Sequence, residues 1–387
     1  MAPNKALPKG AREEDVIRAL SYHRRDFDMA VIRIKPKDNL SVQPGITNPP
    51  NRPFNPAIPG LLDRLPLEIL LTIIPDLDIR SIFSLRRVNA RTRDIISSLK
   101  TYQQVTTHAL GLMCALLRTN LAQWYTLQDI VDVLHTRECT ICGAEFGGFV
   151  SLPPPKLTRC CYPCIQQNAQ IGRRVVDPFT RRFSIEQDHE LITLSEAHNL
   201  YGISPAVLRR ESVPIMKTLR GVYTMNETER KKQHSLVYDK RVRELSSNHK
   251  RGVPWSDTYR RGREMFLRWC MATTAVPFVD PETGEVERGV SCKGCQSHFE
   301  EISSRPRSFG DLSASRDKVY SRAGFLMHFR ECRWARRLWE ASEGGTVSVW
   351  ESKFVRLGGY MKDRDGEGVD EVVVDVKKES PSQITVG

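Results

Sequence analysis

Two pairs of cysteines with a fixed spacing constrain the fold of this chain more than any other feature. Cys139 and Cys142 form one C-x2-C pair, Cys161 and Cys164 form a second, and eighteen residues separate the two pairs. This spacing is typical of zinc-ribbon and treble-clef sites, in which each pair directs two thiolates at one ion. Because four thiolates complete the tetrahedral shell of Zn²⁺, the sequence predicts a structural site rather than a catalytic one. Cys160 is an alternative to Cys161, but it would give a C-x3-C spacing.

A second group of candidate metal ligands lies nearer the C-terminus. Cys292 and Cys295 form another C-x2-C pair, and His328 and Cys332 follow after an interval of thirty-two residues. The i, i+4 spacing of His328 and Cys332 places both side chains on one face of a helix. A cysteine pair and two helix ligands together predict a second closed zinc site, with His298 as an alternative to His328.

The rest of the composition indicates a globular protein with no membrane-spanning segment. No run of about eighteen uncharged apolar residues exists, and Pro75 interrupts the densest candidate, which extends from Ile69 to Leu77. The sequence therefore predicts a protein inside the cell, in the cytoplasm, the nucleus or both. In that reducing setting the 10 cysteines are expected to be metal ligands or free thiols rather than a disulfide framework.

Composition along the chain predicts an α+β protein, mostly helical, built from several modules. The first sixty residues carry nine of the 23 prolines, which break both helices and strands. The predicted divisions are a disordered Pro-rich tail at 1–59, a compact helical segment at 60–105, a helical linker at 106–134, a four-cysteine zinc module at 135–190, a basic helical region at 191–275, a CCHC-type zinc module at 276–345 and a mostly disordered tail at 346–387.

The segment after Gly60 has clear start and stop signals for three short helices. Pro66 suits the first helical position, and Pro75 ends the first helix. Asp78 and Asn89 are placed to cap the second and third helices. The predicted apolar stripes are Leu70, Ile73 and Ile74, then Ile79, Ile82, Leu85 and Val88, then Ile95, Ile96 and Leu99. About forty residues bury too little surface to be stable alone, so part of this apolar surface should contact a partner or the rest of the chain.

Eight residues of this segment follow the outline Leu-Pro-x-Glu, then Ile, Leu-Asp and Arg-Val. They are Leu65, Pro66, Glu68, Ile73, Leu77, Asp78, Arg87 and Val88. In this outline the segment resembles the F-box, a helical motif that docks to the small adaptor subunit of cullin-RING ubiquitin ligases. The resemblance implies that the adaptor-binding residues are Leu65, Pro66, Ile69, Leu70, Ile73 and Leu77. Family members often carry a Trp in the region of Thr92, and a helical hairpin inside an ordinary core is the alternative interpretation.

The middle of the chain carries a second resemblance and a concentration of positive charge. Seven residues that follow the first cysteine module correspond to a Leu-Ile-Thr-x-x-Glu-Ala helix and a Tyr-x-Leu turn, namely Leu191, Ile192, Thr193, Glu196, Ala197, Tyr201 and Ile203. This pattern resembles the zinc-ribbon family of xeroderma pigmentosum group A, which binds damaged DNA. Sixteen Lys and Arg against seven Asp and Glu lie between Pro205 and Cys270. A solvated helical face is one interpretation of this charge, and nucleic-acid binding is the other.

Aromatic residues lie among these cations, as base stacking would require. They are Tyr223, Tyr238, Trp255 and Tyr259. They could equally belong to a core. The order of the modules also resembles fungal-type F-box proteins, in which Gly221 and Tyr223 match a Gly-x-Tyr element and residues 289–295 match a Gly-Val-Ser-Cys-Lys-Gly-Cys run. That resemblance implies no particular substrate.

The sequence contains none of the common catalytic signatures. It lacks P-loop, dinucleotide-binding, zinc-protease and nucleophile-elbow motifs, and both cysteine groups look coordinatively complete. A zinc enzyme would need an open metal position. We therefore expect a protein without enzymatic activity, whose partners are the adaptor, the cullin scaffold and an unknown target protein. Loss of the F-box should then uncouple the target from ubiquitination without unfolding the zinc modules. The alternative function is a zinc-ribbon nucleic-acid-binding protein that uses residues 205–270.

Overall fold

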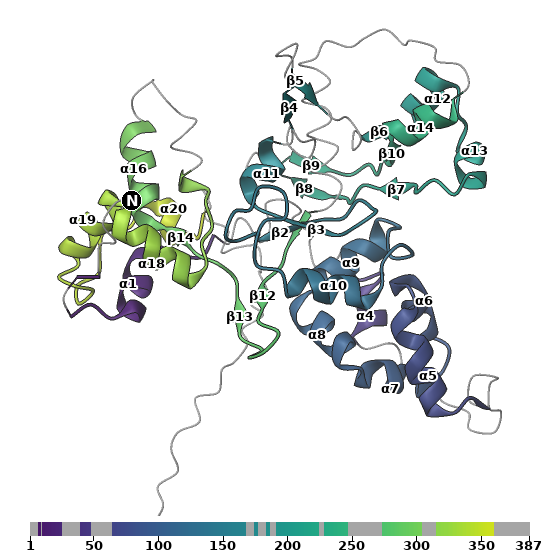
Figure 1. Cartoon of the computed structure of the whole chain (residues 1–387), viewed down its shortest axis with the longest axis horizontal. Helices are drawn as coiled ribbons and strands as arrows, with labels where there is room; N and C mark the ends of the chain where they lie inside the picture. Colours follow the sequence, from purple (N-terminus) through teal and green to yellow (C-terminus); the bar gives the residue numbers. More distant parts are fainter. Residues whose placement is uncertain are drawn as a thin grey trace, which may run out of the picture.

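The structure is a computed structural model that describes residues 7–8, 10–24, 39–47, 64–167, 174–176, 183–185, 191–223, 228–246, 273–303 and 315–359. Helices dominate, and the strands of the described residues form small sheets of two or three strands. The prediction of a mostly helical α+β fold is thus confirmed. Three hydrophobic cores hold the described residues together, and Figure 1 shows the lobes that form around them.

The helical segment after residue 64 begins the largest core. Its elements are α5 (Leu67–Ile73), the 3-10 turn η2 (Ile74–Asp76), α6 (Ile79–Leu85), α7 (Ala90–Ser98) and α8 (Lys100–His108). Asp78 accepts a hydrogen bond from the backbone N–H of Ser81, and Asn89 accepts one from Thr92, so both predicted caps are confirmed. Pro66 lies one residue before the helix rather than inside it.

Two further helices complete this lobe. α9 (Leu110–Arg118) and α10 (Leu127–Leu134) contribute fully buried side chains, including Leu116 and Ile130, to the same core as α6 and α7. Residues 106–134 are therefore not the linker that the sequence suggested, because their apolar side chains face the core rather than solvent. The short α4 (Gln43–Ile46) also packs here, where Tyr102 donates a hydrogen bond to the Ile46 carbonyl oxygen over 2.7 Å.

The first cysteine module continues directly from α10. A three-stranded sheet in the order β11-β2-β3 joins β2 (Phe149–Ser151), β3 (Thr158–Cys160) and β11 (Thr273–Ala275), and α11 (Tyr162–Gln167) follows β3. The guanidinium of Arg159 is buried and donates hydrogen bonds to the carbonyl oxygens of Val133 and Pro277. This residue thereby ties β3 to the end of α10 and to the chain beyond β11.

The middle region forms its own small core. The sheet β6-β10-β7 joins β6 (Leu191–Thr193), β10 (Ser235–Tyr238) and β7 (Met216–Lys217). It packs with α12 (Leu194–Tyr201), α13 (Pro205–Arg210) and α14 (Asp239–Leu245). α12 begins with a capping box between Thr193 and Glu196 and ends at Gly202, whose φ of 68° favours glycine. Two hairpins, β4 (Arg174–Val176) with β5 (Phe183–Ile185) and β8 (Gly221–Tyr223) with β9 (Thr228–Arg230), flank this region.

The C-terminal lobe includes residues from the N-terminus. In Figure 1 the purple helix α1 (Glu13–Leu20) lies among the green and yellow helices α16 (Lys293–Ser303), α18 (Arg322–Glu331), α19 (Arg333–Ala341) and α20 (Lys353–Arg356). β1 (Ser21–Tyr22) pairs antiparallel with β14 (Ser291–Cys292), and the hairpin of β12 (Phe278–Val279) and β13 (Val286–Glu287) precedes β14. Val16 and Leu20 are fully buried in this core.

Parts of both predicted tails thus belong to the fold. Residues 10–24 and 39–47 of the predicted tail at 1–59 carry ordered elements, and Arg24 forms a buried ion pair with Asp317 at 3.0 Å. Phe354 and Val355 of the predicted tail at 346–387 are buried as well. The reason is that short amphipathic segments, too weak to form a core alone, bury their apolar faces against another module. Among the described helices, none has the length and apolar character needed to cross a membrane.

Candidate adaptor-docking helix and metal centres

Helix α5 is apolar on nearly all sides. Leu70 and the following Ile74 are buried in the core, 3% and 1% exposed. Four other apolar side chains of the helix are 40–46% exposed, namely Leu67, Ile69, Leu71 and Ile73. At 100° per residue they form two strips, Leu67 with Leu71 and Ile69 with Ile73, on either side of the buried stripe. A helix on the surface of a soluble protein needs only one apolar stripe, so this helix offers surface for a partner.

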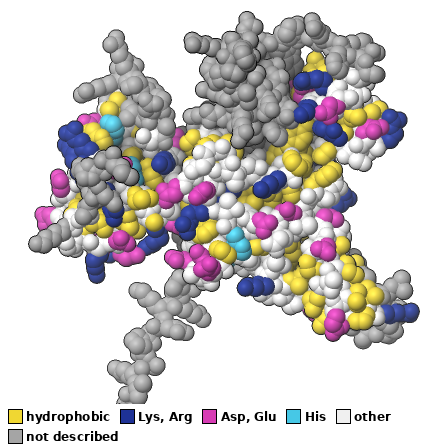
Figure 2. Space-filling view, viewed as in Figure 1, with side chains coloured by type: hydrophobic (Ala, Val, Ile, Leu, Met, Phe, Trp, Pro, Cys, Tyr) yellow, Lys and Arg dark blue, Asp and Glu magenta, His cyan; other side chains and the backbone are white. Residues whose placement is uncertain are grey.

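The six predicted adaptor-binding residues differ in their exposure. Pro66, Ile69 and Ile73 are exposed, while Leu65 and Leu77 are partly buried against the core. Leu70 lies inside the core, and its side chain therefore supports the helix from within. Figure 2 shows hydrophobic side chains gathered over the lobe that carries α5 and α6.

Sequence reasoning missed several residues of this lobe. Leu67 and Leu71 extend the exposed apolar surface, and Val88, which is 62% exposed, lies beyond the end of α6 rather than on its buried stripe. Arg86 is 2% exposed and donates hydrogen bonds to the Ile46 carbonyl oxygen and to Ser97 Oγ. Its long-range partners leave no signal in the local sequence.

Thr92, in the region where related sequences often carry Trp, is also buried. Its hydroxyl donates to the Leu85 carbonyl oxygen at 2.9 Å, and its backbone N–H donates to the Asn89 side chain. A small hydroxyl residue at this position therefore closes the turn between α6 and α7.

The first cysteine group is assembled as the spacing predicted. Cys139, Cys142, Cys161 and Cys164 place their sulfur atoms within 4.8 Å of one another. The Sγ atoms of Cys139 and Cys164 are 3.8 Å apart, and those of Cys142 and Cys161 are 3.7 Å apart. Four sulfurs at 2.3 Å from a tetrahedral ion would lie about 3.8 Å apart. The donor set and its dimensions therefore fit Zn²⁺.

The protonation of this group reflects mutual hydrogen bonding between the thiols. The hydrogen bond with Cys161 lowers the pKa of Cys139, and the same contact raises the pKa of Cys161 to about 12. Gly143 adopts a positive φ of 71° directly after the first pair, and its N–H donates to the Cys139 carbonyl oxygen. Cys160, the alternative to Cys161, is outside the group, and burial raises the pKa of its thiol.

The second group brings together Cys292, Cys295, His328 and Cys332, again within 4.8 Å. The Sγ atoms of Cys295 and Cys332 are 3.9 Å apart, and His328 Nε2 is 3.3 Å from Cys295 Sγ. His298 is outside the group and stacks on Trp334 with ring centroids 4.4 Å apart. Cys332 lies at the junction of α18 and α19 rather than within one helix, because it ends the first and caps the second.

Backbone donors favour the thiolate form in the second group. The N–H of Cys295 donates to Cys292 Sγ, and the N–H of Ala335 donates to Cys332 Sγ, both at 3.4 Å. Cys332 caps α19 directly, and the positive end of the helix dipole stabilises a negative sulfur there. The arrangement can thus hold a dication with a closed shell of three thiolates and one imidazole.

Tyr320 is a residue of this centre that sequence reasoning missed. Its hydroxyl lies 3.2 Å from His328 Nδ1, and the two rings stack with centroids 4.5 Å apart. Because His328 Nε2 faces the sulfurs, the geometry assigns the proton to Nδ1, which donates to the Tyr320 oxygen. A backbone bridge between Val290 and Tyr320 positions the tyrosine beside the Cys292 turn.

The described part of the basic region does not form a comparably defined site. The structure describes residues 205–223 and 228–246, whereas Trp255 and Tyr259 lie outside the described residues, as does the side chain of Tyr223. Tyr238 packs on the largest core, and its hydroxyl donates to the Pro154 carbonyl oxygen. Within the described part, cations such as Arg209 and Lys231 are exposed to solvent.

Comparison with known proteins identifies one domain. The family model described as the F-box domain matches residues 62–104, within the predicted limits of 60–105. The comparisons with curated proteins and with solved structures returned no match. The matched residues contain α5 to α7 and most of α8, and they include all six residues that the sequence assigned to adaptor binding. Residues 62–104 are therefore an F-box domain.

Proposed function

We propose that this protein is a substrate-receptor subunit of an SCF-type cullin-RING ubiquitin ligase. The F-box domain supports adaptor binding as its general role. The observation that carries the proposal is the exposed apolar surface of α5 within the matched residues, which includes Leu67, Ile69, Leu71 and Ile73. F-box proteins generally act as receptors rather than enzymes, so this chain would bring a target lysine close to a ubiquitin-loaded enzyme held elsewhere in the assembly.

The apolar side chains of α5 have two different roles in the proposed docking surface. Leu70 and Ile74 anchor α5 to the core, which leaves the strips of Leu67 with Leu71 and Ile69 with Ile73 available to a partner. Burying one such half-exposed side chain contributes roughly 1 kcal/mol, since a full transfer contributes about 1.5–3 kcal/mol. Several of them together support a stable and largely apolar interface.

We further propose that both cysteine groups bind Zn²⁺ as structural ions. Cys139, Cys142, Cys161 and Cys164 would hold the first ion, and the second would be held by Cys292, Cys295, His328 and Cys332. A bound zinc ion in such a shell would supply folding free energy rather than reaction chemistry. The C-terminal region would then present a rigid surface to the target.

The test of adaptor binding is capture of the purified chain by the adaptor subunit at low and high salt. The double variant Ile69→Lys, Ile73→Lys replaces exposed residues, so it should remain folded. We expect it to lose about a hundredfold in affinity, because two apolar contacts would be replaced by buried charges. Capture of the unmodified protein should change little with salt, since apolar contacts are not screened.

The matched control replaces two exposed apolar residues outside the F-box. Val286 and Val347 are 40% and 49% exposed, close to the values for Ile69 and Ile73. Val286→Lys, Val347→Lys should bind the adaptor as the unmodified protein does. Equal capture of both double variants would rule out α5 as the docking helix, and no capture of any form would rule out the receptor function.

A further inference from the structure

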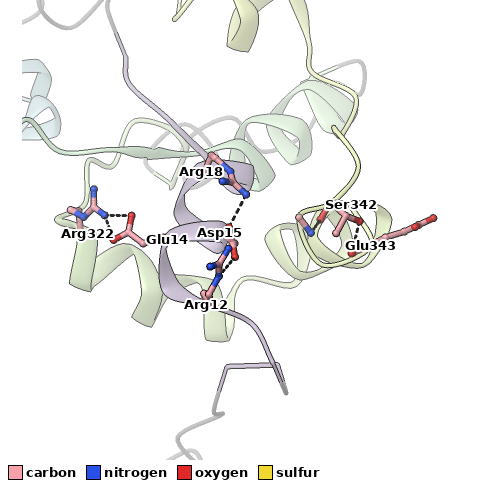
Figure 3. Close-up of polar contacts among 9 residues, drawn as sticks. Arg12, Glu14, Asp15, Arg18, Arg322, Ser342 and Glu343 are labelled. Atoms are coloured by element: carbon pink, nitrogen blue, oxygen red, sulfur yellow. Dashed lines mark hydrogen bonds and ion pairs between the residues drawn. The ribbon is translucent and has the colours of Figure 1, made fainter. Parts of the chain in front are cut away.

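A cleft of about 500 Å³ opens between the C-terminal lobe and the start of the first cysteine module. Its walls are α1, α18 and the β12–β13 hairpin, together with Arg137 just after α10. Figure 3 shows one wall, where Glu14 of α1 and Arg322 of α18 face each other. The cleft belongs neither to the F-box nor to either cysteine group, because its lining residues include no member of these sites.

Part of the cleft lining is apolar. Ile17, Phe278 and Leu326 line it, and each is 6–8% exposed. Met327 lies at the margin and is 59% exposed, which is unusual for so large an apolar side chain. An exposed methionine is flexible and polarisable, and it adapts to side chains of different shape.

The three arginines of the cleft already have partners. Arg322 forms an ion pair with Glu14 at 2.6 Å, and Arg137 lies 3.6 Å from Glu287 with its guanidinium 4.3 Å from the centroid of the Phe278 ring. Arg330 also has an interaction partner, although its buried Nε forms no hydrogen bond within the described residues. The positive charge of these arginines is therefore largely balanced by groups of the protein itself.

The acidic side chains outnumber these arginines. Beyond Glu14 and Glu287, the cleft is lined by Glu13, Asp280 and Glu285. Backbone N–H groups of Thr283 and Glu282 donate to Asp280 and hold the pKa of its carboxyl below the usual value, so it stays ionised. Within the described part of the chain, Glu13 and Glu285 form no ion pair at 4.0 Å or less, although Glu285 contributes to the raised pKa of Arg322. Figure 2 shows acidic side chains beside the hairpin.

We propose that this cleft binds a basic–apolar segment of the target protein, in which Lys or Arg flanks an apolar side chain. The apolar side chain would contact Phe278 and Met327, while the cations would pair with Glu13, Asp280 and Glu285. We choose a basic partner because of charge complementarity. The cleft is acidic, although the formal net charge of the whole chain is +12. The identification of the ligand as a ubiquitination target rests on the proposed function, whereas the peptide-binding activity does not.

The experiment measures binding of a short fluorescent peptide in which Lys and Arg alternate with Leu, by anisotropy with the full zinc-loaded chain. An isomer with Glu in place of Lys and Arg is the control ligand. We expect the basic peptide alone to bind, with an affinity that falls as ionic strength rises. The double variant Glu13→Lys, Glu285→Lys should lose about tenfold in affinity at low salt, because two attractive charges become repulsive.

A matched protein control carries the same change of net charge elsewhere. Glu211 and Glu340 are exposed residues of other elements that do not line the cleft, so Glu211→Lys, Glu340→Lys should bind the basic peptide normally. The milder Glu13→Gln, Glu285→Gln variant and thermal melting distinguish lost binding from lost folding. Equal affinity of the cleft and control variants, equal binding of the acidic peptide, or no binding at all would overturn the proposal.

Adaptor capture by the same preparations keeps the two proposals separate. The cleft variants should bind the adaptor normally, because α5 is unchanged. Peptide binding without adaptor capture would overturn the proposed function and leave the cleft standing as a peptide site. Adaptor capture without peptide binding would overturn the cleft as a peptide site and leave the proposed function standing.

Discussion

At the scale of single residues, the second cysteine group is supported by a tyrosine that is not one of its four candidate ligands. The hydroxyl of Tyr320 accepts the Nδ1 proton of His328, which directs Nε2 toward Cys295. Such partners fix the tautomer and the orientation of a histidine ligand, and their loss typically weakens metal binding. The stacked ring adds a second restraint on the imidazole plane.

We predict that Tyr320→Phe keeps the stacked ring but lowers the zinc affinity of the second group about tenfold. Competition with a chromophoric chelator measures this, and the first group should release its ion as before. Tyr201→Phe is the control, since it also removes a hydrogen-bonded hydroxyl, here one bonded to Asp239 Oδ1 at 2.7 Å, and Tyr201 packs on a core that contains none of the eight candidate ligands. Unchanged affinity in Tyr320→Phe would mean that the hydroxyl does not position the ligand.

A glycine within the second cysteine pair gives a sharper steric prediction. A Cβ on Gly294 would lie 2.4 Å from the backbone nitrogen of Ala335, so α16 and α19 could not approach as closely. We expect Gly294→Ala to destabilise the C-terminal lobe by about 1–3 kcal/mol in chemical denaturation, as overpacking does. Gly111→Ala in α9 is the control, because a Cβ there meets nothing within 4 Å and should stabilise the helix by about 0.5–1 kcal/mol. Similar effects of the two changes would contradict the steric argument.

A residue's role could be predicted from the sequence when its interaction partners lie close to it along the chain. The eight residues of the two cysteine groups and the caps at Asp78 and Asn89 could be predicted because each signal, a C-x2-C pair, an i, i+4 pair or a cap, lies within a few residues. Tyr320 and Arg86 were missed because their partners are set by tertiary packing, across 8 residues for the tyrosine and 40 for the arginine. Leu70 was assigned to the adaptor surface by the resemblance to the F-box, and the structure buries its side chain in the core.

At the scale of elements, α1 shows how a local pattern can be correct while its context stays unknown. Val16, Ile17 and Leu20 recur at helical spacing inside the predicted tail at 1–59, and a helix forms there. Its partners lie more than three hundred residues away, where α1 packs on the core of α18 and α19. An eight-residue helix is unstable alone, so α1 is held in place by this burial.

We predict that Leu20→Ala destabilises the C-terminal lobe by about 2–5 kcal/mol, because the side chain is fully buried. The second metal group should then lose its ion at a lower denaturant concentration, while the first group keeps its own. Denaturation followed by metal release measures both events. Arg18→Ala on the same helix is the control, since the Arg18 side chain is 69% exposed and contributes only a surface ion pair. An unchanged C-terminal lobe in Leu20→Ala would mean that α1 is dispensable.

At the scale of the whole molecule, the F-box domain is not an independent unit. One core runs from Ile82 of α6 through Leu134 of α10 to Phe149 and Cys161 of the first cysteine module. Tyr125 donates a hydrogen bond to the Leu152 carbonyl oxygen at 2.7 Å, and its own carbonyl oxygen accepts one from the N–H of Ile79 in the F-box. Sequence reasoning treated these parts as separate modules because composition marks segments but not the contacts between them. Deleting the F-box would therefore expose the core beneath it, contrary to the expectation that the zinc modules would be unaffected.

The shared core predicts that the two metal groups differ in their influence on adaptor binding. Cys161→Ser should weaken the first metal shell and lower the stability of the F-box as well, so adaptor capture should decline at temperatures where the unmodified protein still binds. Cys295→Ser should impair only the C-terminal lobe, because its cluster is the separate core around α1, α18 and α19. Capture by the adaptor across a temperature series, with circular dichroism on the same samples, measures the difference. If both variants lowered capture equally, the two cores would have to be coupled through contacts such as Arg137 with Glu287, and the division into two thermodynamic units would be wrong.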